Sequence, residues 1–243
     1  MSEERKADGG ICCGADVRCE YMTGAAYSMM EKKAPVLIVF DIDGTLSDTI
    51  ELGRELFKQV FALMGYGVIS DELADSFNGP SADEVCRVMG VGPDRRPLYN
   101  ELLETIEDEL VEKMGQMYPG AAQMIEALAP HAILALLTNG TQRYCETTIR
   151  EFSLTPYISL HSGYVSGVTK AQRMQQWAAQ TGARRVICVG DRGTDVKNGK
   201  AVGALTIAVT YGLGSREELE GADVICDTTA QVTKECLRAI GEY

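Results

Sequence analysis

The chain has 243 residues, of which 45% are hydrophobic and 24% are charged, and its formal net charge is −12. This composition is typical of a globular protein with a sizeable core, and the acidic balance argues against a nucleic-acid partner or an anionic membrane surface. Eight scattered cysteines, with no visible signal peptide and no apolar run of the ~20 residues that span a membrane, predict a cytoplasmic protein with reduced thiols.

Residues 1–33 contain charges and glycines without a clear period, so we expect a poorly ordered N-terminal extension with at most a short helix near residues 25–33. The apolar run Val36–Phe40 follows and predicts a buried strand. Asp41 and Asp43 lie at its C-terminal end, which is where ligands bind in a parallel α/β sheet. Carboxylate oxygens gathered at one point favour a divalent hard cation.

The stretch from residue 50 to residue 117 is expected to contain several helices, joined by turns and a loop, and no strand. The spacing of Asp48 and Glu51 resembles a capping box and predicts a helix start, and Ser81 with Glu84 repeats that pattern. This is more helix than one crossover between strands requires. We therefore predict that residues 50–117 form an all-helical cap inserted into a core of residues 34–49 and 118–243.

After residue 120 the chain alternates between helices and apolar runs. This rhythm predicts an α/β fold, with a doubly wound parallel sheet covered by helices on both faces. The further strands are expected at residues 133–138, 158–161, 186–191, 205–209 and 223–226.

Polar residues follow several of these strands, and parallel strands bring such residues to one edge of the sheet. They are Thr138, Asn139 and Gly140 after one strand and Asp191 after another, with Asp195 four residues later and Lys170 opening a helix. Acids and a Thr-Asn-Gly sequence at several strand ends indicate phosphoryl transfer, in which positioning and charge neutralisation supply most of the catalysis.

Each residue type suits one part of that chemistry. Asp41 is the candidate nucleophile, forming an aspartyl-phosphate, and Asp43 is the candidate general acid and then general base. We expect Mg²⁺ to be held by Asp41, the backbone carbonyl of Asp43 and Asp191, while Asp195 orients the water around it or binds it directly.

The phosphoryl oxygens need hydrogen-bond donors and a positive charge. The Thr138 hydroxyl and backbone N–H groups at Gly44, Asn139 and Gly140 are the expected donors, and Lys170 is the expected cation. In the predicted cap, the loop containing Gly79 and Ser81 is expected to face the substrate.

These ordered motifs resemble the haloacid dehalogenase superfamily, in its phosphoglycolate-phosphatase-like branch with a helical cap. The resemblance covers about residues 34–232. It implies a Rossmann-like sheet, a Mg²⁺ ion and a phospho-aspartate. It also implies a small-molecule phosphate ester as the substrate, with the protein acting as a monomer or homodimer.

The superfamily contains several activities, and single residues separate them. Dehalogenases lack a carboxylate at the place of Asp43, and related sugar phosphomutases carry a His and an Arg where this chain has Gly53 and Ala82. Many phosphoglycolate phosphatases carry Lys at the place of Gly140, which leaves nucleotide monophosphates and other small monoesters open. A phosphomutase and a non-catalytic phosphate-binding regulator are the alternative functions.

Overall fold

The computed structural model describes residues 35–241, so the extension and short helix predicted for residues 1–33 lie outside the described residues. The predicted α/β fold is confirmed: six strands form one sheet in the order β3-β2-β1-β4-β5-β6, and every neighbouring pair is parallel. The strands are β1 (Val36–Phe40), β2 (Ile133–Leu137), β3 (Ile158–Ser162), β4 (Arg185–Gly190), β5 (Leu205–Val209) and β6 (Val224–Cys226).

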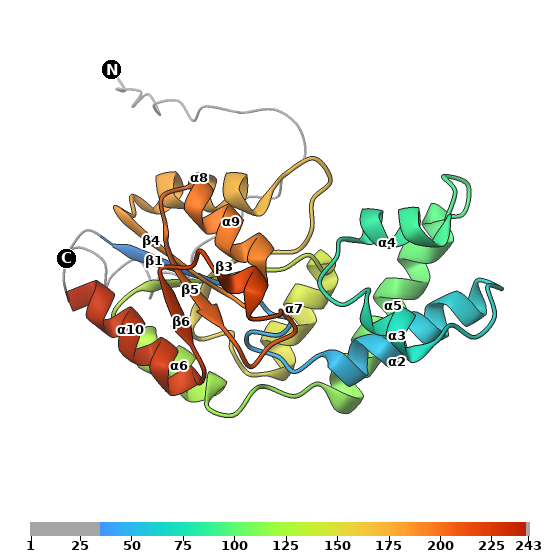
Figure 1. The fold of residues 1–243 in the computed structure, drawn as a ribbon, viewed down its shortest axis with the longest axis horizontal. Helices are drawn as coiled ribbons and strands as arrows, with labels where there is room; N and C mark the ends of the chain where they lie inside the picture. Colours follow the sequence, from blue (N-terminus) through green and yellow to red (C-terminus); the bar gives the residue numbers. More distant parts are fainter. Residues whose placement is uncertain (1–34, 242–243) are drawn as a thin grey trace, which may run out of the picture.

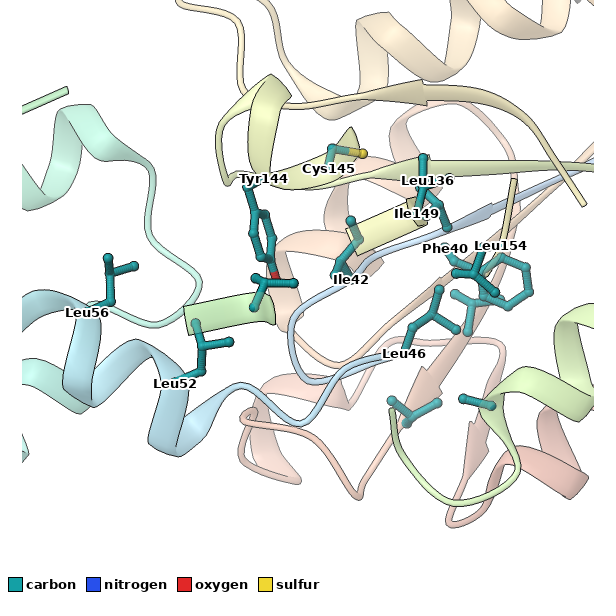
Figure 2. Close-up of a cluster of buried hydrophobic side chains, with 14 of the residues drawn as sticks. Phe40, Ile42, Leu46, Leu52, Leu56, Leu136, Tyr144, Cys145, Ile149 and Leu154 are labelled. Atoms are coloured by element: carbon teal, nitrogen blue, oxygen red, sulfur yellow. The ribbon is translucent and has the colours of Figure 1, made fainter. Parts of the chain in front are cut away.

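Helices cover both faces of this sheet (Figure 1). Alternate side chains of β1 explain why, because Leu37 and Val39 pack with Trp177 of α8 on one face, whereas Ile38 and Phe40 belong to the larger core on the other. Figure 2 shows part of that larger core around Phe40. The covering helices are α6 (Ala121–Leu128), α7 (Gln142–Glu151), α8 (Lys170–Thr181), α9 (Gly193–Ala201) and α10 (Thr229–Gly241), with a short 3₁₀ helix at Glu217–Leu219.

Four helices between β1 and α6 form a separate layer beside the sheet, which we call the helical insertion (Figure 1). Within it α2 packs on α5, and α5 also packs on α7 of the sheet layer. None of the helices within residues 35–241 is both long and apolar enough to cross a membrane. The insertion consists of α2 (Ile50–Leu63), α3 (Asp71–Asp75), α4 (Ala82–Met89) and α5 (Arg96–Met114).

The chain enters and leaves the helical insertion through two adjacent segments. The Tyr118 N–H donates to the Leu46 carbonyl over 2.9 Å, and the Asp48 N–H donates to the Gln116 carbonyl over the same distance. The two connections therefore pair with each other instead of crossing the molecule separately.

One of the two predicted capping boxes is wrong. Helix α2 begins after Thr49, which makes no side-chain cap, and the Glu51 carboxylate accepts a hydrogen bond from Arg54 instead. The capping box at α4 forms as predicted, because the Ser81 hydroxyl accepts from the Glu84 N–H and the Glu84 carboxylate accepts from the Ser81 N–H.

Candidate active site

The acidic residues predicted at the strand ends meet where β1 and β4 lie side by side. This is the point at which the strand order reverses, and such points form ligand crevices in open α/β sheets. Asp41 follows β1, Asp191 follows β4, and Asp195 lies in the first turn of α9. One carboxylate oxygen from each lies within 4.8 Å of the others.

Glycines make this close approach possible. Gly44 has φ +74°, and a Cβ atom there would lie 2.1 Å from Oδ2 of Asp191. A Cβ atom at Gly190 would lie 2.4 Å from the Cβ atom of Asp195. Asp191 is then fixed by the Leu213 N–H, which donates to its Oδ2 over 2.7 Å.

Lys170 supplies a positive charge within this acidic cluster. Its ammonium lies 3.0 Å from Oδ1 of Asp41 and 2.8 Å from Oδ1 of Asp195, and the three side chains are largely buried. Burial lowers the pKa of Lys170, but the two carboxylates outweigh it and hold the pKa above its usual range, so the side chain stays charged.

One lysine does not balance three buried carboxylates. Burial raises the pKa of Asp41 well above its usual range, Lys170 lowers it, and Asp195 and Asp191 raise it further. Burial and then Asp195 raise the pKa of Asp191 to about 7. Three oxygen donors that repel one another in this way fit a divalent hard cation, which would relieve the repulsion.

Replacing Asp191 by Asn is therefore expected to raise the Tm of the metal-free protein at pH 7.5. The folded protein binds more protons at this site than the unfolded chain between pH ~4 and ~7, so the site's contribution to stability falls as pH rises through that window. Thermal unfolding in a chelator should show a Tm gain at pH 7.5 that shrinks at pH 5. Glu101→Gln, at an exposed position on α5, is the matched control, and an equal gain in that variant contradicts the interpretation.

The Asp43 side chain takes a different direction from the acidic cluster. The Thr138 hydroxyl donates to its Oδ2 over 3.0 Å and the Tyr144 hydroxyl donates to its Oδ1 over 2.7 Å. Tyr144 was not expected from the sequence. Its ring occupies the space beside Gly140, where a Cβ atom would lie 2.4 Å from the ring, so the absence of a longer residue there has a steric reason.

Two of the remaining predicted donors, the backbone N–H groups of Gly44 and Gly140, have partners in this structure. The Gly44 N–H donates to the Ser47 carbonyl over 2.9 Å, and the Gly140 N–H donates to the Thr138 hydroxyl over 2.9 Å. The Asn139 side-chain amide, a different group from the predicted backbone N–H, donates to the Gly79 carbonyl over 2.8 Å, which brings the predicted cap loop to the site.

A cavity of about 380 Å³ lies between the sheet edge and the helical insertion. Asp43 and Tyr144 line it from the sheet layer, and Tyr99 and Glu107 of α5 line it from the insertion. Glu107 is 7% exposed and accepts a hydrogen bond from the Thr141 hydroxyl over 3.2 Å. Sequence reasoning missed it, although a carboxylate one helical turn after Leu103 on an apolar stripe was an available signal.

A second cavity of about 450 Å³ adjoins the first. Thr138 and Lys170 line it, together with Arg173 of α8. Asn139 and Tyr164 line both cavities. The predicted strand-end residues are thus gathered in one region. The Ser81 hydroxyl serves as the cap of α4, and Ser81 also lines the second cavity.

Known proteins resemble this chain in sequence and in fold. Tyrosine-protein kinase PtkA of Mycobacterium tuberculosis is 23% identical over 225 residues, covering 86% of this chain and 74% of the kinase. Phosphoglycolate phosphatase of Synechococcus elongatus is 25% identical over 190 residues, covering 76% of this chain and 88% of that enzyme. The crystal structure of a predicted phosphatase from Clostridium acetobutylicum superposes with a TM-score of 0.74 at 21% identity, covering 85% of this chain and all of that one.

The family described as haloacid dehalogenase-like hydrolases matches residues 38–209, which is more than half of the chain. That range runs from β1 to β5 and contains every residue of the acidic cluster, Lys170 and the whole helical insertion. The chain belongs to the haloacid dehalogenase-like hydrolase family.

Proposed function

We propose that this protein is a Mg²⁺-dependent phosphatase that hydrolyses a small-molecule phosphate monoester through an aspartyl-phosphate on Asp41. The observation that carries the proposal is the contact between Lys170 and Asp41, 3.0 Å apart, beside the buried carboxylates of Asp191 and Asp195. A carboxylate held next to a fixed cation can accept a phosphoryl group whose negative charge that cation offsets. The phosphoglycolate phosphatases among the relatives give independent support.

In the first step an Asp41 oxygen attacks phosphorus, and the bond from phosphorus to the leaving oxygen breaks. Lys170, the Thr138 hydroxyl and the backbone at Gly44, Asn139 and Gly140 are the groups we assign to the phosphoryl oxygens. For some of them this requires exchanging a present partner, since the Thr138 hydroxyl donates to Asp43 in this structure.

Asp43 carries the proton in both steps. As an acid it protonates the leaving oxygen, and as a base it removes a proton from the water that attacks the aspartyl-phosphate. Hydrogen bonds from Thr138 and Tyr144 to its two oxygens support this role, because they fix the carboxylate away from the acidic cluster.

Residues suited to Mg²⁺ are the carboxylates of Asp41, Asp191 and Asp195, with the backbone carbonyl of Asp43 as a further ligand in the proposal. When bound, the ion would neutralise charge on the phosphoryl oxygens and lower the repulsion among these carboxylates. With that repulsion reduced, Lys170, which lowers the pKa of Asp41, would hold the nucleophile ionised at neutral pH.

The proposal predicts phosphate release from p-nitrophenyl phosphate that requires added Mg²⁺. A chelator should lower the rate at least about 100-fold, because the uncompensated carboxylates would repel the substrate dianion. Restoring Mg²⁺ should recover the activity, whereas Ca²⁺, which takes more ligands at longer distances, should not. Equal rates with Mg²⁺ and with chelator would contradict the metal requirement.

The other functions considered give different results in the same assay. A phosphomutase would need a bisphosphate and return an isomerised ester, and a protein kinase like the named relative would consume ATP and label a tyrosine. A non-catalytic regulator would bind beryllofluoride without turnover. Incubating the protein with a phosphate ester, with ATP, or with both, and then identifying the products, distinguishes a phosphatase from these three alternatives.

A further inference from the structure

The cavity between the sheet edge and the helical insertion has an unusual charge balance. Among its lining residues in the described part of the chain, four are acidic, namely Asp43, Asp83, Glu104 and Glu107, and one, Arg96, is basic. The Arg96 guanidinium donates to Asp83, which also accepts from the Tyr164 hydroxyl over 2.5 Å. The only cation among these lining residues is thus already paired with a neighbouring carboxylate.

Two buried hydroxyl groups on the wall of this cavity have no hydrogen-bond partner. The Tyr99 side chain is fully buried, the Thr49 side chain is 2% exposed, and neither hydroxyl bonds to any described residue. A buried hydroxyl without a partner is costly, and a hydroxylated ligand or a water in the cavity can supply the partner that the protein does not.

Glu107 completes this polar wall. Burial and then Asp43 raise the pKa of Glu107 well above its usual range. A ligand hydroxyl can donate to the carboxylate form or accept from the acid form, so it suits Glu107 in either state. A ligand carboxylate can only accept, and it would add a negative charge beside Asp43 and Glu104, where the described lining residues of this cavity offer no cation other than the paired Arg96.

The size of the cavity sets a second limit on the ligand. Its volume of about 380 Å³ lies within the ~300–1,000 Å³ range of sites that take drug-sized ligands. Apolar side chains form much of the rest of its wall, including those of Leu52, Phe57 and Phe77. A two-carbon group such as glycolate would leave most of this space unfilled.

We propose that this cavity receives the alcohol part of the substrate and selects bulky hydroxylated alcohols that are neutral or cationic, discriminating against phosphorylated carboxylic acids. The inference rests on the phosphatase function proposed above. Tyr99 and Glu107 are the specificity-determining residues, since they present the polar groups that a hydroxylated ligand would satisfy.

Two pairs of phosphate esters that differ only at a carboxylate test the proposal. Sorbitol 6-phosphate is compared with 6-phosphogluconate, and uridine 5′-monophosphate with orotidine 5′-monophosphate. We expect kcat/KM to favour the member without the carboxylate at least about tenfold in both pairs. For an ester that is not hydrolysed, its inhibition constant in the hydrolysis of acetyl phosphate is compared instead. A ratio of kcat/KM values or of inhibition constants below about three in either pair overturns the proposal.

Acetyl phosphate separates this inference from the proposed function, because its leaving group is too small to fill the cavity. Mg²⁺-dependent turnover of acetyl phosphate with no preference in the pairs overturns the inference alone. Absence of Mg²⁺-dependent turnover of both acetyl phosphate and p-nitrophenyl phosphate overturns the proposed function and the inference with it.

Variants on α5 assign the preference to named side chains. Glu107→Gln should bring the ratio in each pair toward one, whereas Glu109→Gln, at an exposed position on the same helix, should leave it unchanged. Tyr99→Phe should raise KM or the inhibition constant of the favoured esters at least about threefold. Its Tm should stay equal or rise because the lost hydroxyl has no partner, and an unchanged constant overturns the role of Tyr99.

Discussion

Replacing Asp41 by Asn is expected to lower kcat for p-nitrophenyl phosphate by at least about 10³-fold. The amide keeps the size of the side chain and can still accept the hydrogen bond that the Ile42 N–H donates over 2.9 Å, but it cannot attack phosphorus. Removing one buried carboxylate also relieves the repulsion from Asp191 and Asp195. The variant should therefore lose activity while its Tm stays equal or rises.

The measurement is steady-state phosphate release with saturating Mg²⁺, accompanied by thermal unfolding of the same proteins in a chelator. Glu101→Gln, exposed on α5, serves as the matched acid-to-amide control and should retain full activity. Trapping of labelled phosphate on wild-type protein quenched in acid, and its absence in Asp41→Asn, would locate the covalent intermediate. Activity in Asp41→Asn within tenfold of the wild type would rule out Asp41 as the nucleophile.

Replacing Asp43 by Asn is expected to lower kcat by about 10²–10⁴-fold for an alkyl phosphate. The amide oxygen can still accept from Thr138 or Tyr144, so the local geometry should persist, but the side chain can no longer transfer a proton. An alkoxide leaves poorly without that proton, whereas p-nitrophenolate is a stable anion. The loss should therefore be smaller for p-nitrophenyl phosphate than for sorbitol 6-phosphate.

This dependence on the leaving group distinguishes proton transfer from a structural role. A variant that only disturbed the site would lose activity equally with both esters. The two substrates should be compared at saturating concentration in the wild type and in Asp43→Asn. An equal loss of kcat with both esters would show that Asp43 is not the general acid and acts only by positioning other groups.

The sheet and its acidic edge could be predicted from the sequence because their signals are local. An apolar run such as Val36–Phe40 has few alternatives to a buried strand, and a carboxylate directly after it must lie at the strand end. The parallel arrangement then places Asp41 and Asp191 at the same edge of the sheet, and the pairing of β1 with β4, which the sequence did not predict, brings them together. Ser81 and Glu84 were equally predictable, since a capping box is formed by residues three positions apart.

Contacts between distant segments could not be predicted in this way. The hydrogen bond from Tyr144 to Asp43 joins residues 101 positions apart, so it depends on how the fold brings α7 to the residues that follow β1. The burial of Glu107 depends on the docking of α5 against α7. At Asp48 the local sequence favours a helix cap, but the Asp48 side chain is exposed and caps no described helix. The backbone N–H of Asp48 instead pairs with the Gln116 carbonyl, a contact that the local sequence does not predict.

The pairing of the two connections has a consequence for how this chain can change. Because the Leu46 carbonyl and the Tyr118 N–H meet over 2.9 Å, the ends of the helical insertion are already joined in space. A different set of helices could be grafted at the same two points, or the whole set replaced by a short turn, without displacing β1 or α6. In the proposed function the reacting residues belong to the sheet layer, whereas Tyr99 and Glu107 belong to the helical insertion. A protein engineer could therefore exchange the insertion while keeping the reacting residues.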